Sequence, residues 1–122
     1  MPQAGLGIDT WPHIVAARLP DLSADLACVA GFDGRFRQTT GDWGALLGWT
    51  DEQLRSRPLL DFVHDDDAVA TRAHLAEARG GGSVSRFQNR FLVADGSTRW
   101  LLWTAVGVPD EQAYHAVARV RS

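Results

Sequence analysis

The sequence predicts an α+β fold, in which one five-stranded antiparallel sheet carries its helices over one face. Apolar and polar residues alternate in segments that are joined at Asp33-Gly34 and at Asp95-Gly96, dipeptides typical of hairpin turns. Between the two hairpins lie segments with helical spacing that end at glycines. The chain has 122 residues, 45% of them hydrophobic, which is enough for one domain with its own core.

Residues 1–21 form a flanking segment, and residues 22–122 form the predicted domain. In the flanking segment a helix is expected to begin after Thr10, with a proline near its first turn. Its apolar residues are spaced to form one stripe, made of Trp11, Ile14, Val15 and Leu19. A helix this short is not stable alone, so we expect it to pack on another surface.

The domain itself opens with a predicted hairpin, whose strands are residues 26–32 and 35–39. After residue 41 the apolar residues follow the period of a helix, because Trp43, Leu46 and Leu47 fall on one face. Gly48 is expected to end this helix.

Two further helical segments and a short turn follow. Thr50 and Gln53 match the capping box that opens a helix, and residues 59–63 give a short apolar turn. Three carboxylates at residues 65–67 are expected to cap the free N–H groups at the positive end of a longer helix, which the glycines at residues 80–82 end.

Three strands complete the sheet, at residues 84–94, 98–108 and 112–121. In the first of them apolar residues alternate with polar ones, and Asn89 falls on the apolar face between Phe87 and Phe91. A buried amide needs hydrogen-bond partners. A ligand is one expected partner of Asn89, and the backbone or a buried water is the other, with about equal weight.

The strand at residues 98–108 is apolar on both faces. Leu101, Trp103 and Ala105 share one face, and Trp100, Leu102 and Val106 share the other. Helices cover only one face of a single sheet, so the second face is expected to need the N-terminal helix, another subunit, or both.

Composition excludes several classes of function. A net charge of −3 and a pI near 5.7 leave no basic excess for nucleic-acid binding. The single cysteine, Cys28, forbids an internal disulfide and a cysteine zinc site, as in a reducing cytosol. The sequence has no apolar run of membrane-spanning length and no secretory signal, so a soluble cytoplasmic protein is expected.

The order of these motifs resembles that of a PAS domain, of the type found in bacterial sensor histidine kinases and diguanylate cyclases. The resemblance covers about residues 22–121, and departs from the family at Thr40, where an Asn is usual, and at Asp65, where a Pro is usual. It is carried by the segments Phe32-Asp-Gly-Arg-Phe36, Trp43 to Trp49 with its Leu-Gly-Trp ending followed by Thr50, Phe62-Val-His-Asp-Asp-Asp67, and Arg90-Phe with Asp95-Gly-Ser-Thr-Arg-Trp100.

The resemblance implies a pocket between the concave face of the sheet and the central helices, in which some relatives hold a flavin, haem or metabolite. Flavin photochemistry through a thiol adduct is excluded, because the expected cysteine is missing from the helical region around residues 55–61. Haem ligation by His74 is disfavoured, because a histidine on an amphipathic helix is far more often at the core edge or in solvent. No metal site is expected at the Asp65–Asp67 run, whose spacing is that of a helix start.

The predicted binding site combines strand and helix residues around this pocket. Its members are Cys28, Trp43, Phe62, Phe87, Asn89, Phe91, Leu101 and Trp103. No nucleophile has a base partner and no buried acid–base pair is visible, so an enzyme is not expected.

The second face of the sheet is the predicted dimer interface, since PAS relatives commonly dimerise through this surface and such an N-terminal helix. The interface residues are Trp11, Ile14, Val15, Leu19, Trp100 and Leu102. Two functions stay open: a ligand-binding sensory module that signals to an effector such as a histidine kinase, a diguanylate cyclase or a transcription regulator, and a ligand-free dimerisation or docking domain. The end of the chain just after the last strand is expected to be a truncation before a linker.

Overall fold

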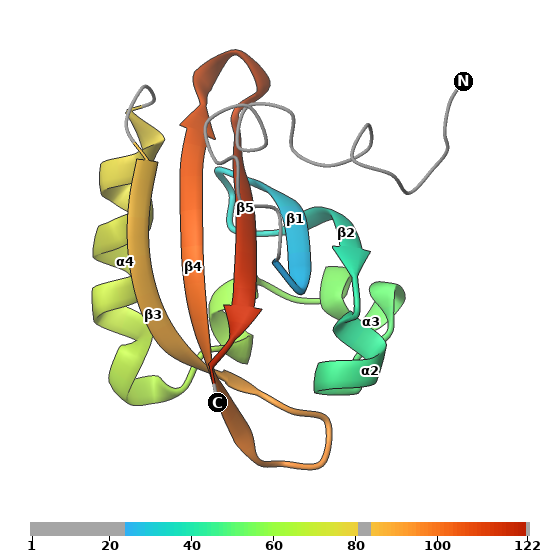
Figure 1. Ribbon diagram of the computed structural model, residues 1–122. Helices are drawn as coiled ribbons and strands as arrows, with labels where there is room; N and C mark the ends of the chain where they lie inside the picture. Colours follow the sequence, from blue (N-terminus) through green and yellow to red (C-terminus); the bar gives the residue numbers. More distant parts are fainter. Residues whose placement is uncertain (1–23, 81–83, 122) are drawn as a thin grey trace.

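A computed structural model describes residues 24–80 and 84–121 (Figure 1). The predicted helix at residues 10–19 lies outside this part of the chain. The elements follow in the order β1 (Leu26–Gly31), β2 (Phe36–Gly41), α2 (Trp43–Leu47), α3 (Asp51–Arg55), the 3-10 helix η2 (Leu59–Phe62), α4 (Asp65–Arg79), β3 (Val84–Leu92), β4 (Thr98–Val108), the 3-10 helix η3 (Pro109–Glu111) and β5 (Ala113–Val120). The predicted order of strands and helices is confirmed.

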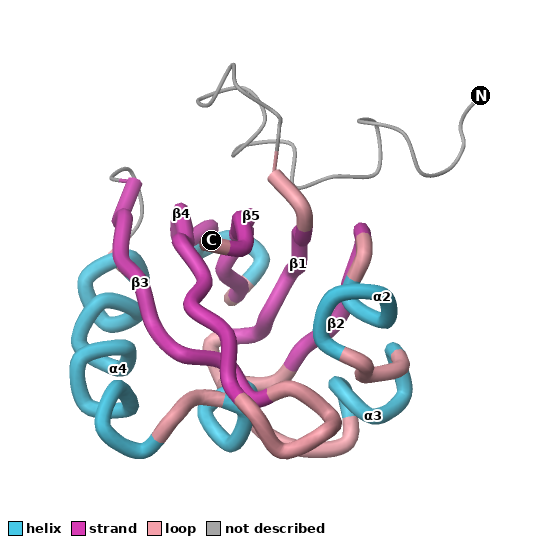
Figure 2. Tube along the Cα trace, turned by 60° about the horizontal axis from the view of Figure 1, so that its bottom comes forward, coloured by secondary structure: helices cyan, strands magenta, loops and turns pink. Residues whose placement is uncertain are grey.

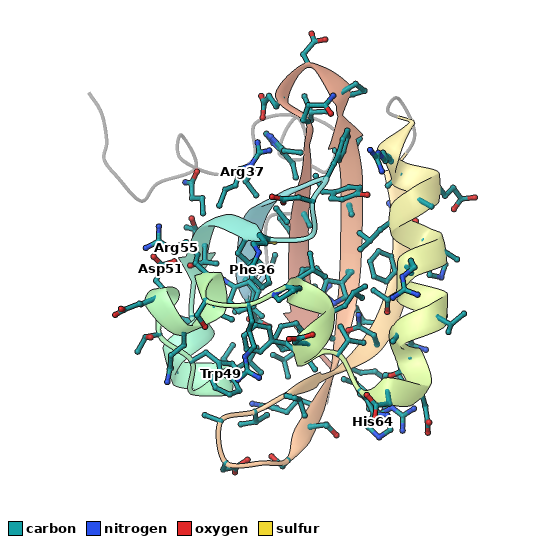
Figure 3. The ribbon with its side chains drawn as sticks, turned by 180° about the vertical axis from the view of Figure 1, so that it is seen from behind. Phe36, Arg37, Trp49, Asp51, Arg55 and His64 are labelled. Atoms are coloured by element: carbon teal, nitrogen blue, oxygen red, sulfur yellow. The ribbon has the colours of Figure 1, made fainter. Side chains whose placement is uncertain are left out.

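The strands form one antiparallel sheet in the order β2-β1-β5-β4-β3. The first and last strands therefore pair at its centre, with Cys28 opposite Ala116. The sheet is curved, and the helices lie on one side of it (Figure 2). Figure 3 views the molecule from the side on which the helices lie, so that they stand in front of the sheet. The α+β class predicted from the sequence is confirmed.

Local chemistry explains why the elements begin and end where they do. Gly34 and Gly96 adopt φ values of 86° and 94° in the two predicted turns, a region that glycine enters without steric cost. Gly48 ends α2 with a φ of 81°. Thr50 and Gln53 form the predicted capping box of α3, because each side chain accepts a hydrogen bond from the backbone N–H of the other.

The start of α4 differs in detail from the expectation that its three carboxylates cap the helix. The cap is His64, whose Nδ1 accepts a hydrogen bond from the Asp66 backbone N–H at 3.0 Å. Asp67 instead turns towards β3 and accepts hydrogen bonds from the backbone N–H and the guanidinium of Arg90. Since β3 is an edge strand, this contact and the bond from His64 N–H to the Arg90 carbonyl cover its open edge.

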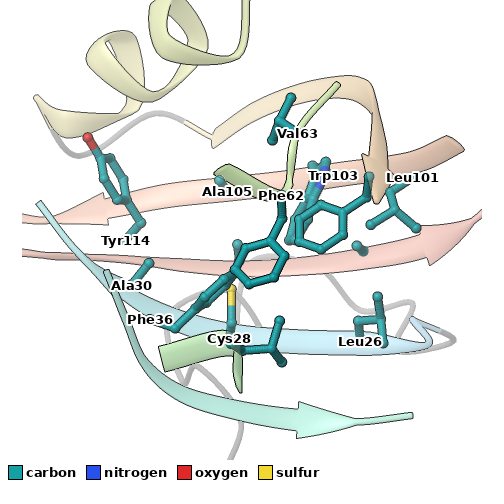
Figure 4. Close-up of a cluster of buried hydrophobic side chains, with 14 of the residues drawn as sticks. Leu26, Cys28, Ala30, Phe36, Phe62, Val63, Leu101, Trp103, Ala105 and Tyr114 are labelled. Carbon is teal, nitrogen blue, oxygen red and sulfur yellow. The ribbon is translucent and has the colours of Figure 1, made fainter. Parts of the chain in front are cut away.

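The core lies between the concave face of the sheet and the helices (Figure 4). Alternate residues of the central strands point into it, including Leu26, Cys28 and Ala30 of β1. α4 packs closely on β4 at Gly107, where an added Cβ would lie 2.2 Å from a carbonyl oxygen of the helix. This close approach is possible because Gly107 has no side chain.

Candidate functional site

A small cavity of about 30 Å³ lies in the core, between the sheet and α4. Five of the predicted site residues line it: Cys28, Phe87, Asn89, Phe91 and Trp103. The other lining residues are Ala30, Phe36, Leu59, Val63, Thr71, Leu75, Ala105, Tyr114 and Ala116. The structure thus gathers predicted residues from β1, β3 and β4 around one space.

The remaining predicted residues, Trp43, Phe62 and Leu101, are buried but do not line the cavity. Phe62 stacks on Phe91 at a centroid distance of 5.6 Å, and Trp43 lies 6.3 Å from the Trp103 ring. These side chains fill the space beside the cavity, so they set its size by packing against its walls.

The polar groups of the cavity form a chain across the core. The indole Nε1 of Trp103 donates a hydrogen bond to Oδ1 of Asn89 at 2.9 Å, and Nδ2 of Asn89 donates to Oγ1 of Thr71 at 3.2 Å. An indole N–H can only donate, so its contact fixes which end of the amide is the oxygen. Asn89 of β3 therefore links β4 to α4, and its partners are two side chains, whereas a ligand, the backbone or a buried water was expected.

Sequence reasoning missed the contributions of α4 and of the segment before it. Thr71, Leu75 and Ala78 share one face of α4, and the first two line the cavity. Their i, i+4, i+7 spacing is a signal that could have found them. It is weak because Thr71 and Ala78 are small and the rest of the helix is rich in alanine and charged residues.

His74 lies one turn after Thr71, and its ring stacks on Phe87 at a centroid distance of 4.8 Å. The imidazole is thus engaged against an aromatic side chain at the end of the cavity. A flavin or a haem does not fit these residues, because ligand pockets for molecules of that size enclose roughly 300–1,000 Å³.

Burial raises the pKa of the Cys28 thiol to about 12. The thiol is therefore neutral at physiological pH and behaves as a small apolar wall residue. Among residues 24–80 and 84–121, no three His, Cys, Asp or Glu side chains are grouped so that they could hold a metal ion.

The convex face of the sheet carries the other predicted surface. Trp100 and Leu102 are 37% and 42% exposed there, whereas Val106 on the same face is buried. Two guanidinium groups lie over the Trp100 ring, that of Arg90 at 5.1 Å and that of Arg121 at 5.5 Å from its centroid.

A groove of about 660 Å³ crosses β3, β4 and β5, and Leu102 is part of its lining. Its lining includes Arg86, Gln88, Leu102, Thr104 and Val117. The predicted interface residues Trp11, Ile14, Val15 and Leu19 lie outside the described part of the chain.

Comparison with solved structures supports the fold. The PAS-B domain of Drosophila melanogaster Cycle with bound ethylene glycol superposes with a TM-score of 0.70 at 13% identity, covering 79% of this chain and 99% of that chain. A domain of a sensory box sensor histidine kinase/response regulator from Geobacter sulfurreducens gives 0.68 at 17% identity, with 88% and 92% covered. The PAS domain of the Cronobacter turicensis quorum-sensing receptor RpfR, in complex with C12:0, gives 0.69 at 12% identity, with 85% and 100% covered.

Comparison of the sequence with known proteins identifies a family. None of the curated protein sequences matches the chain. Within the described residues no helix has the length and apolar character needed to cross a membrane. The family model of the PAS fold matches residues 35–118, which is more than half of the sequence and runs from β2 into β5. The chain therefore belongs to the PAS fold family.

Proposed function

We propose that the chain is the sensory module of a bacterial signal-transduction protein, and that it binds a small ligand in its interior cavity. The observation that carries this proposal is the polar chain from Trp103 through Asn89 to Thr71, which faces a cavity between the sheet and α4. Hydrogen-bonding groups inside an otherwise apolar cavity are typical of ligand recognition. A ligand that bonds to Asn89 would alter the contact of this side chain with Thr71 of α4, and this change would be the signal.

The ligand part of this proposal can be tested on the purified protein. Its native mass is compared with its denatured mass, and its visible absorption is recorded. An extra native mass that is lost in the Asn89→Leu variant supports the proposal. Equal native and denatured masses, with no small molecule able to perturb the Asn89 amide, count against ligand sensing.

The module is further proposed to act as a homodimer through the convex face. Trp100 and Leu102 are exposed there as neighbours on β4, beside the groove. Exposed apolar patches of this kind are commonly interaction sites. The residue 10–19 segment, with its apolar stripe, would complete the interface.

Light scattering tests the dimer. The wild-type protein is expected to have twice the mass of one chain, and Leu102→Ser is expected to shift it towards the monomer. Val69→Ser, at an apolar residue that is 76% exposed on α4, is the matched control and should change nothing. A wild-type monomer that is unaffected by deleting residues 1–21 would contradict the proposal.

The second candidate function is a ligand-free dimerisation or docking domain. The packing of Phe62, Phe91, Trp43 and Trp103 favours it, because these rings leave a cavity of only about 30 Å³. A dimer with an empty interior that no small molecule enters would support this second function.

The partners proposed from the sequence remain part of the proposal. The output would pass to an effector domain or partner protein such as a histidine kinase or a diguanylate cyclase, in the cytoplasm and without catalysis by this chain. The similarity to a domain of a sensor histidine kinase/response regulator supports the kinase as the first to test. Measuring the output of the protein that carries this module, with and without Asn89→Leu, tests that coupling.

A further inference from the structure

We infer that the interior site is selective for a very small uncharged molecule of roughly two or three non-hydrogen atoms, which offers one hydrogen-bond acceptor to Asn89. This inference rests on the proposed function and narrows its ligand to one chemical class. Size, charge and hydrogen bonding each limit what the cavity accepts.

Size sets the first limit. The cavity measures about 30 Å³. A single water needs about 10–15 Å³ of such space, so the cavity has room for about two waters or one molecule of similar size. A fatty acid, a flavin or a metabolite with a ring requires a cavity at least about ten times larger.

The walls resist expansion because the rings behind them are packed against each other. Phe62 and Phe91 are stacked with their planes 5° apart, and Phe62 also contacts Trp49 at a centroid distance of 5.2 Å. On the other side α4 is held to the edge strand by the Asp67–Arg90 contact, with both carboxylate oxygens engaged. Enlarging the cavity would require these contacts to separate.

Charge sets the second limit. No Asp, Glu, Arg or His belongs to the lining of the cavity. Its titratable members are Cys28 and Tyr114, and burial raises the pKa of both, which keeps them neutral. An ion that enters this site would lose its hydration without gaining a counter-charge, so the ligand must be uncharged.

Hydrogen bonding sets the third limit. Asn89 is only 2% exposed. Its side-chain amide donates one N–H to Thr71 and accepts from Trp103 through its oxygen. Among the described residues the structure records no partner for the second N–H. A ligand with an oxygen acceptor would satisfy this group, whereas a purely apolar molecule would leave it unpaired.

The test follows two individual signals in ¹H–¹⁵N NMR spectra of the whole chain, the side-chain amide of Asn89 and the indole N–H of Trp103. The amide is assigned by its loss in Asn89→Leu. Ethanol, 1-hexanol and decanoate are the probes. We expect ethanol to shift both signals saturably, while 1-hexanol and decanoate leave them in place. The indole of Trp49, which donates to the Leu92 carbonyl, should not move with any probe.

A cavity variant makes the size limit directly testable. Leu75→Ala removes part of the wall and should admit 1-hexanol, whereas Val69→Ala on the exposed side of the same helix should not. If Leu75→Ala does not fold, Leu75→Val makes the same comparison with a smaller change. Failure of the folded Leu75 variant to admit 1-hexanol would refute the size limit.

Two results with the wild-type protein would also overturn the inference, and they bear differently on the proposed function. Saturable binding of 1-hexanol or decanoate by the wild-type protein refutes the size or the charge limit but leaves ligand sensing intact. If no probe shifts either signal, both the inference and the ligand part of the proposed function fail. The ligand-free docking function would then stand.

Discussion

Replacing Trp103 by Phe removes one donor from the buried polar chain and keeps an aromatic ring in its place. In the wild-type protein the indole Nε1 donates to Oδ1 of Asn89 at 2.9 Å, and both residues are buried. Phe has no N–H, so the Asn89 oxygen is left without this donor in the core. Thr71 does not take its place, because its hydroxyl contacts the nitrogen end of the Asn89 amide and not the oxygen.

The expected loss in the free energy of unfolding follows from the burial of the Asn89 oxygen, which has lost its donor. A buried polar atom without a partner costs about 1–3 kcal/mol. The smaller ring adds lost contacts beside Trp43 and Phe91, which lie 6.3 Å from Trp103 between ring centroids, worth about 1 kcal/mol. We expect Trp103→Phe to lower the free energy of unfolding by about 2–4 kcal/mol.

A double-mutant cycle separates the hydrogen bond from the lost packing. Asn89→Leu alone leaves the Trp103 N–H unpaired. The double variant contains neither the Trp103 N–H nor the Asn89 oxygen, so neither group is left without a partner. The double variant should therefore be more stable than the sum of the single effects predicts, by about 1–2 kcal/mol. Urea unfolding followed by circular dichroism measures all four proteins.

Trp49→Phe is the matched control, because its indole donates to the Leu92 carbonyl and shares no hydrogen-bond partner with Asn89. Its effect should add to that of Asn89→Leu within about 0.5 kcal/mol. Additivity of the same quality for Trp103→Phe would refute the direct coupling and, with it, the fixed orientation of the amide.

Three further outcomes are expected. Because burial raises the pKa of Cys28 to about 12, the native thiol should not react with a disulfide reagent at pH 8 until the protein unfolds; rapid stoichiometric labelling of the native protein would contradict this. The hydrogen bonds from Arg90 hold the pKa of Asp67 below its usual value, so this stabilisation is present above the unfolded pKa of about 3.9 and is lost as the pH falls through the lower folded value. The stability difference between the wild type and Asp67→Asn should therefore shrink in acid, and a constant difference from pH 7 to the acid limit would show that the reasoning is wrong. Gly107→Ala places a Cβ 2.2 Å from the α4 backbone and should destabilise the protein by about 3 kcal/mol or more, whereas Gly44→Ala, with nothing nearer than 3.9 Å, should be neutral or stabilising in thermal unfolding.

Much of the fold could be predicted because its signals are local. The turns at Gly34 and Gly96 and the glycine ending at Gly48 depend on backbone conformations that few other residues adopt. The capping box at Thr50 depends on residues three positions apart. Alternation along β3 and β4 then settled which side chains face the core, including Asn89.

The candidate site was harder to predict because it depends on contacts between elements far apart in the chain. Asn89 was expected to bond to backbone, water or a ligand, and its partners are Thr71 of α4 and Trp103 of β4, neither of which is near it in sequence. The position of Asp67 at a helix start indicated capping, but its carboxylate instead accepts hydrogen bonds from the backbone N–H and the guanidinium of Arg90. Long-range partners of this kind follow from the packing of α4 on the sheet.

Domains that share this fold can differ in the free space of their interior, and that space limits which ligand they can bind. The PAS domain of the quorum-sensing receptor, solved in complex with C12:0, superposes on this chain with a TM-score of 0.69. Here Phe62 and Phe91 stack and Trp103 bonds to Asn89, and these side chains occupy most of the interior space. Similarity of fold therefore does not determine what the interior can hold, which depends on the aromatic rings and the one amide around the cavity.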